Sequence, residues 1–173
     1  MQPSSTAPDD VPVARLARAR TARRLFFVVL CLLLVAAAAG LLGVRTGQAE
    51  ARSGAYRLSV RYPSATRPGL SAAVEIEIRR QGGFSSPVTI AVDSSYLDAF
   101  DLDEPEPHPT AATSDGERLI WTFAPPADGD TLEVSIDGRV QPGVQLVRAA
   151  GSVAVVDEGS VAASVQFHTL VLP

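Results

Sequence analysis

The sequence has no lysine and no asparagine, and it has only two histidines and one cysteine, Cys31. Without lysine there is neither a Schiff-base amine nor the phosphate-binding lysine of a Walker-type loop. A single cysteine excludes both a disulfide within the chain and a cysteine-based zinc site. Without asparagine there is no N-glycosylation sequon. These absences remove several common classes of enzyme and of exported glycoprotein.

The residues available for catalysis are also few. His108 lies within a proline-rich acidic segment, and His168 is expected on the opposite strand face from Val165 and Phe167. A hydrolytic triad needs a nucleophile beside a base that a third group orients, and no Gly-x-Ser-x-Gly motif is present. We therefore expect no enzymatic activity and no cofactor.

The longest apolar run in the chain is Leu25 to Val44, twenty residues without a charge. A helix of this length reaches about 30 Å, the thickness of the hydrocarbon core of a bilayer. The run predicts a transmembrane helix over 25–44, with the lipid bilayer as its partner. Residues 1–24 are expected to form a disordered basic tail, and its five arginines place the N-terminus in the cytoplasm. The C-terminal domain is then extracytoplasmic, in a single-pass protein of the cell membrane.

A cleavable signal peptide is the alternative interpretation of the same run. Ala49-Glu50-Ala51 has the small-x-small spacing that signal peptidases accept, so cleavage after Ala51 stays open. The apolar run exceeds the 7 to 15 residues usual for a signal peptide, which favours a retained anchor. In both cases the domain that follows is exported.

Small residues lie on the outer half of the predicted span. Ala36 and Gly40, like Ala39 and Gly43, are four residues apart, and this spacing lets two helices approach closely. The pattern predicts a helix-packing face for a second copy of the chain or for a membrane-protein partner. Alanine-rich spans of no special function are the alternative.

Charge divides the chain into two parts. Residues 46–173 contain nine arginines and seventeen acidic residues, a formal charge of -8. A nucleic-acid interface needs clustered basic residues, so this part of the chain is not expected to bind nucleic acid.

Apolar and polar residues alternate with a period of two through most of residues 55–173, which we expect to form one extracytoplasmic domain after a linker at 45–54. No convincing helix interrupts the pattern, although residues 94–100 could form one turn. Seven strands are expected, at 56–62, 70–78, 88–92, 118–123, 132–136, 153–155 and 161–171.

Seven short strands separated by turns predict an all-β fold, a seven-stranded antiparallel immunoglobulin-like β-sandwich preceded by one transmembrane α-helix. A small β-barrel is the competing fold. The arginine-only basic composition indicates a GC-rich, actinobacterial-type genome. With its anchor and strands, the chain resembles bacterial single-pass envelope proteins that have an immunoglobulin-like outer domain. This resemblance implies a fold more than a function.

An acidic segment interrupts the strands between residues 93 and 106. Four of its carboxylates, which are hard oxygen ligands of the kind that calcium prefers, form a candidate metal site: Asp98, Asp101, Asp103 and Glu104. The spacing fits no EF-hand. The alternative is a solvated loop that its prolines keep extended.

The sequence thus favours a non-enzymatic, membrane-anchored envelope protein whose outer domain mediates protein–protein interaction as an accessory subunit of a membrane complex. The alternative is an extracytoplasmic domain that senses a ligand or calcium through the acidic 93–106 loop. The identity of the partner or ligand and the oligomeric state do not follow from the sequence.

Overall fold

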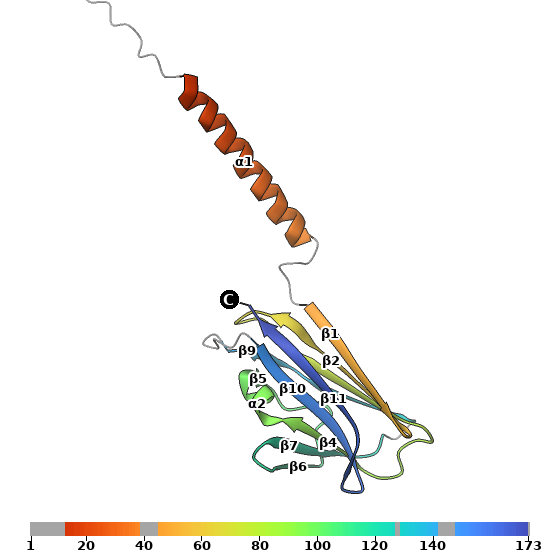
Figure 1. Ribbon diagram of the computed structural model, residues 1–173. Coiled ribbons are helices and arrows are strands. Elements are labelled where there is room, and N and C mark those ends of the chain that lie inside the picture. The colour runs from red at the N-terminus through yellow and green to blue at the C-terminus, as the bar shows by residue number, and fades with distance from the viewer. Residues whose placement is uncertain (1–12, 39–44, 127–128, 142–147, 173) are drawn as a thin grey trace, which may run out of the picture. The chain divides into compact units, whose positions relative to one another are not determined.

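The computed structural model describes residues 13–38, 45–126, 129–141 and 148–172. The chain divides into two compact units, one that ends at residue 43 and one that begins at residue 44. The first contains helix α1 (Val13–Ala38), and the second is a β-domain (Figure 1).

Helix α1 differs from the predicted transmembrane helix. Among the described residues, no helix is both long enough and apolar enough to cross a membrane. The prediction of a single-pass signal-anchor helix at 25–44 is corrected accordingly. The observed helix begins at Val13, so it includes the five arginines, and its apolar part from Leu25 to Ala38 extends about 21 Å against the roughly 30 Å of a bilayer core. Residues 39–44 lie outside the described residues.

The β-domain consists of strands joined by short turns and one short helix, α2 (Ser94–Ala99), the single turn expected there. The strands are β1 (Arg45–Ser53), β2 (Tyr56–Thr66), β3 (Val74–Arg80), β4 (Val88–Asp93), β5 (Phe100–Leu102), β6 (Ala111–Ser114), β7 (Arg118–Phe123), β8 (Thr131–Ile136), β9 (Gly138–Val140), β10 (Arg148–Asp157) and β11 (Ser160–Val171).

The observed sheet is not the predicted seven-stranded antiparallel immunoglobulin-like sandwich, and that prediction is wrong. Nine strands form one mixed sheet in the order β6-β7-β4-β10-β11-β2-β3-β8, with β1 paired to β2, while β5 and β9 form a separate two-stranded sheet. The end of β2 runs parallel to the end of β11, where Ala65 lies opposite Leu170. This parallel pair joins strands that a sandwich would divide between two sheets.

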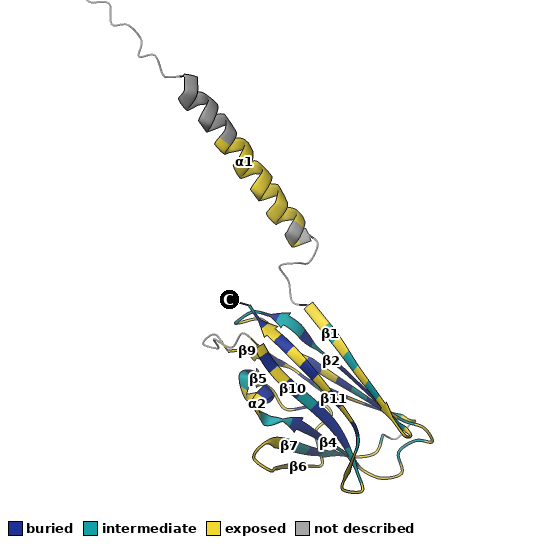
Figure 2. Cartoon of the chain, viewed as in Figure 1, coloured by how far each residue is buried: buried dark blue, intermediate teal, exposed yellow. Residues whose placement is uncertain are grey.

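The large sheet is curled, a mixed half-barrel that encloses one core (Figure 1). Tyr62 of β2 stacks on Phe167 of the neighbouring strand β11, with ring centroids 4.7 Å apart, where the two arms of the sheet join. Strand β11 alternates between exposed and buried residues along its length, as Figure 2 shows. The core takes buried side chains from both arms, among them Leu58, Ile76, Val134, Ile90, Val153 and Phe167.

Strand β1 occupies residues that the sequence predicts as a linker. It pairs with β2 from Arg45 opposite Ala65 to Ser53 opposite Tyr56. Its half-buried residues are Gly47, Ala49 and Ala51, and the two alanines pack against the core. A Cβ added to Gly47 would lie 2.9 Å from Cζ of Tyr62, so glycine is required for this close approach.

Candidate functional site

The outer side of strands β1, β2, β3 and β8 is strongly polar. In β3, Val74, Ile76 and Ile78 are buried, so the alternate residues Glu75 and Glu77 project away from the core. We call this surface the charged face. Its side chains are Gln48, Glu50, Arg57, Ser59, Arg61, Glu75, Glu77, Arg79, Glu133 and Ser135.

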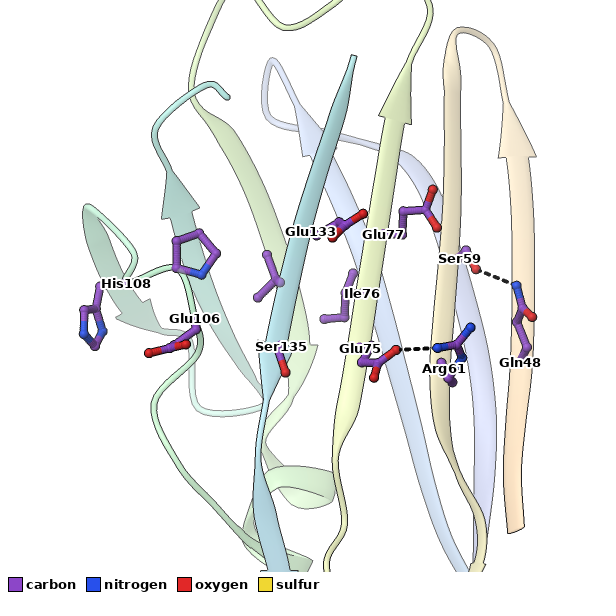
Figure 3. Close-up of a pocket in the computed structure, with 12 residues that line it drawn as sticks. Gln48, Ser59, Arg61, Glu75, Ile76, Glu77, Glu106, His108, Glu133 and Ser135 are labelled. Carbon is purple, nitrogen blue, oxygen red and sulfur yellow. Dashed lines mark hydrogen bonds and ion pairs between the residues drawn. The ribbon is translucent and has the colours of Figure 1, made fainter. Parts of the chain in front are cut away.

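The charged face is hollowed into an open groove of about 930 Å³ (Figure 3). The margin beside β8 is formed by the segment with Glu106 and His108. The backbone N–H of Glu106 donates to the carbonyl of Ser135, and the N–H of Ser135 donates to the carbonyl of Glu106, both at 2.8 Å. This two-way pairing covers the edge of β8 and holds Glu106 beside the groove. Gln48 lines the opposite margin, on β1.

Ion pairs and hydrogen bonds connect neighbouring strands across the charged face. Arg61 Nη1 lies 2.8 Å from Glu75 Oε2, and Gln48 Nε2 donates to Ser59 Oγ at 3.0 Å. Within β3, Arg79 pairs with Glu77. The side chains of these ion pairs are largely exposed, so the pairs add little to the stability of the fold. The bonds order the groove more than they stabilise the domain.

Two glutamates lie directly opposite each other within the groove. The pairing of β3 with β8 places Glu77 opposite Glu133, and like charges at such a position are destabilising. Within the described residues, Glu133 forms no ion pair. The described lining contains four glutamates and one arginine, Arg61. Glu75 pairs with Arg61 and Glu77 with Arg79, so the negative charge of the described lining that is not balanced by an ion pair comes from Glu106 and Glu133, and it favours a positively charged occupant beside β8.

The histidines are placed poorly for catalysis. The side chain of His108 is 74% exposed, and its Nδ1 lies 3.7 Å from Oε2 of Glu104. His168 lies opposite Ala150 on the exposed side of β11. Across the described residues, neither histidine hydrogen bonds to a serine or threonine hydroxyl, and the two occupy different strands or loops.

The predicted calcium ligands are only partly brought together. Asp98 of α2, Asp101 of β5 and Asp103 line a small pocket of about 290 Å³, but Glu104 is not among its lining residues. In the parts of the chain that the structure describes, no group of three or more His, Cys, Asp or Glu residues could hold a metal ion. The calcium site stays a prediction.

Helix α2 is anchored beside this small pocket by a buried tyrosine. The hydroxyls of Tyr96 and Thr169 lie 2.8 Å apart, and the ring of Tyr96 packs against Phe100 and Phe167. Burial raises the pKa of Tyr96 to about 12, because the charged phenolate would lose its hydration. The position of the acidic segment therefore depends on a contact between α2 and β11.

Only one of the predicted helix-packing residues lies in the described part of the chain. Ala36 is within the helix, whereas Ala39, Gly40 and Gly43 lie outside the described residues. Helix pairing therefore stays a prediction.

Sequence reasoning missed the groove. The alternation of Arg57, Ser59 and Arg61 and that of Glu75, Glu77 and Arg79 each indicate one exposed strand face. That these two faces adjoin, and that Glu133 completes them, depends on strand pairing between residues far apart in the chain. To find the groove from the sequence, one would have needed a hypothesis about which of these strands pair and in which register.

The comparisons with known proteins give no family. No protein-family model matches the chain, and no curated protein matches it. The chain is similar to the N-terminal domain of a Streptococcus gordonii adhesin at a TM-score of 0.49 and 12% identity, over 66% of this chain and 32% of the adhesin chain. It thus spans about a third of that structure.

Two enzymes are also among the similar structures. AvmM, which catalyses macrocyclization in alchivemycin A biosynthesis, has a TM-score of 0.39 and 9% identity, over 73% of this chain and 98% of its own. The Pseudomonas fluorescens alkylpurine DNA glycosylase AlkC, bound to DNA containing an abasic site analog, has a TM-score of 0.33 and 11% identity, over 75% of this chain and 32% of its own. Likenesses this weak assign no function to the chain.

Proposed function

We propose that the β-domain is a non-enzymatic protein-binding module whose groove takes an extended, positively charged segment of a partner protein. The carrying observation is the Glu77–Glu133 pair in a groove lined by four glutamates and one arginine. Because Arg79 already pairs with Glu77, the carboxylate of this pair that has no ion-pair partner among the described residues is that of Glu133. A cationic side chain of a partner seated beside Glu133 would supply the missing opposite charge.

The shape of the groove favours a peptide over a small molecule. Small-molecule sites are usually concave, mostly apolar and largely enclosed. This groove is open and is lined by glutamates, serines, glutamine and arginine along the strands (Figure 3). An extended segment of a partner matches both the open geometry and the charge, and the domain then serves as an accessory subunit of a larger complex.

The sensing alternative has less support. Asp98, Asp101 and Asp103 share a pocket, but the described carboxylates form no group that could hold a metal ion. An enzymatic role is also weakly supported, because the two histidines lack the oriented partners that acid–base chemistry requires.

We place this activity outside the cytoplasm. Arginines followed by apolar residues, as at 15–24 and from Leu25 onward, are typical of segments that direct export. The β-domain contains no cysteine, so its folding does not depend on the redox state of the compartment.

Site-specific photocrosslinking in the native cells tests the binding proposal. A benzoylphenylalanine at Ser135, beside Glu133 in the groove, is expected to give an adduct with a partner protein. Charge reversal by Glu133→Arg should reduce that adduct at least tenfold, because the groove then repels a basic segment. The matched control carries the photocrosslinker at Glu117, in the exposed turn between β6 and β7.

The same adduct should weaken as salt is added, since the proposed contact is electrostatic. Equal adducts from Ser135 and Glu117, or an adduct that Glu133→Arg leaves unchanged, would contradict the proposal.

A further inference from the structure

The small pocket of about 290 Å³ lies outside the charged face, between α2, β5 and β7, and its inner lining is apolar. Leu97, Phe100 and Trp121 are each at least nine-tenths buried, and half-buried Leu102 and Leu119 extend this apolar surface. An apolar pocket with a few polar groups is typical of a small-molecule site. Because a cavity of about 150 Å³ accommodates benzene, this pocket has room for roughly ten non-hydrogen atoms.

The exposed part of the same lining is acidic. It contains Asp98, Asp101 and Asp103, and within the described residues none of these three aspartates forms an ion pair. Strand pairing places Arg139 opposite Asp101, but the two side chains do not pair and Arg139 does not line the pocket. The mouth of the pocket therefore has a negative charge that favours a cationic ligand.

The arrangement of these aspartates suits an organic cation better than a metal ion. In the described ranges, no group of three or more His, Cys, Asp or Glu residues could hold a metal ion. Calcium takes six to eight oxygen ligands, whereas most of this lining is carbon. An organic cation can place its charged group among the aspartates while its apolar body covers the leucines and aromatic rings.

Trp121 adds a hydrogen-bond donor to the pocket. It is only 7% exposed, yet its indole N–H donates to no acceptor among the described residues. A buried indole N–H usually has a partner. The described side-chain atoms that are fully enclosed without a partner are Thr66 Oγ1 and Arg80 Nε, so the indole N–H still has access to solvent. Trp121 lines this pocket, which places its unpartnered donor where a ligand oxygen can accept.

From these observations we propose that the pocket binds a small amino alcohol with an apolar body. Its ammonium group lies among Asp98, Asp101 and Asp103, its apolar body covers the inner lining, and its hydroxyl oxygen accepts from the indole N–H of Trp121. An amino acid is a poorer ligand, because the aspartates repel its carboxylate. This site is separate from the groove on the charged face and adds a small-molecule ligand to the proposed binding of a partner segment.

Tryptophan fluorescence of the full chain tests the inference directly, because Trp121 is the only tryptophan. Titration with 2-amino-1-phenylethanol is expected to give a saturable change in emission with a Kd of roughly 0.1–1 mM, as for a good ligand of about ten atoms. The matched diol, 1-phenyl-1,2-ethanediol, has a hydroxyl in place of the amine and should bind at least tenfold more weakly. 2-Phenylethylamine lacks the hydroxyl and should bind at least threefold more weakly.

Substitutions that remove single charges locate the site. Asp98→Asn and Asp101→Asn nearly keep the shape of exposed side chains, and each should weaken binding of the amino alcohol at least threefold while the circular dichroism spectrum stays unchanged. The matched control is Glu104→Gln, which removes a neighbouring exposed carboxylate that does not line the pocket and should leave the Kd unchanged.

Equal binding of the amino alcohol and the diol would show that the pocket is merely apolar and would overturn the inference. So would the absence of a saturable change up to 10 mM amino alcohol, or equal losses for Glu104→Gln and Asp101→Asn. The same emission change on addition of 1 mM calcium would assign the aspartates to a metal ion instead. Because the compounds are compared on the wild-type chain, the result depends neither on a variant's folding nor on a partner protein in the groove.

Discussion

At the scale of single residues, the interior of the β-domain leaves little freedom around Tyr96. Its hydroxyl is buried against that of Thr169, and its ring contacts Phe100 and Phe167. Close to these rings, Gly151 on β10 brings the backbone near enough that a side chain has no room. Substitutions of Tyr96 and Gly151 are therefore expected to change stability rather than binding.

Stability should fall at high pH because of Tyr96. The pKa is about 12 in the folded protein and 10.0 in the unfolded chain, so the folded state keeps a proton that the unfolded state releases between these values. The stabilisation that this proton gives the folded state is fully present below pH 10. It is lost as pH rises toward 12, which lowers the free energy of unfolding by up to about 2–3 kcal/mol. Denaturation curves at pH 8 to 11.5 should show a shallower decline for Tyr96→Phe than for the wild type, and parallel declines would show that Tyr96 is not responsible.

Gly151→Ala should destabilise the domain. The added Cβ would lie 2.8 Å from both Phe167 Cε2 and Tyr96 Cδ2, and both rings are buried in the core. Overpacking of this kind costs about 1–3 kcal/mol, which urea unfolding would measure. Ser152→Ala, at the next and half-buried residue on the opposite strand face, is the control and should change little. A loss for Gly151→Ala no larger than that of the control would refute this account of the packing.

At the scale of elements, β1 is the clearest case in which sequence reasoning failed. Its inward-facing residues are Gly47, Ala49 and Ala51, which are too small to produce a visible hydrophobic period. Strands β5, β6 and β9 were missed because three or four residues are too few for any period. Among the longer strands, 118–123 matches β7 at both ends, whereas 153–155 covers only part of β10.

Removal of β1 should weaken the domain. A fragment of residues 52–173 lacks most of the strand that pairs with β2, whereas a fragment of 45–173 retains it. Uncovering roughly 120 Å² of apolar surface at about 25 cal/mol per Å² predicts a loss of about 3 kcal/mol in urea unfolding. Equal stability of the two fragments would show that β1 contributes nothing.

The position of β1 also bears on whether the chain is cleaved after Ala51. Cleavage after Ala51 would cut within the strand and remove most of its pairing with β2. We therefore expect the mature protein to retain residues 45–53, and a mature chain that begins at Arg52 in N-terminal sequencing would contradict this.

At the scale of the whole molecule, the chain combines a basic N-terminal segment with an acidic β-domain. The charged face of that domain is the surface that we propose takes a basic partner segment.

Export of the β-domain is tested with paired reporters fused after Pro173. Alkaline phosphatase, which is active only outside the cytoplasm, should be active in the fusion, and deletion of residues 25–38 should abolish that activity. Green fluorescent protein at the same position should stay dark. A fluorescent fusion together with an inactive phosphatase fusion would place the domain in the cytoplasm.

The sequence by itself determined which residue types are lacking, where most strands lie and how charge is divided along the chain. These properties follow from residue composition or from alternation along one strand, and neither requires knowing which distant residues are in contact. Only the tertiary structure decided that β2 meets β11 in parallel and that Glu77 faces Glu133. The physical reason is that strand pairing depends on contacts between distant residues, which alternation along a single strand does not specify.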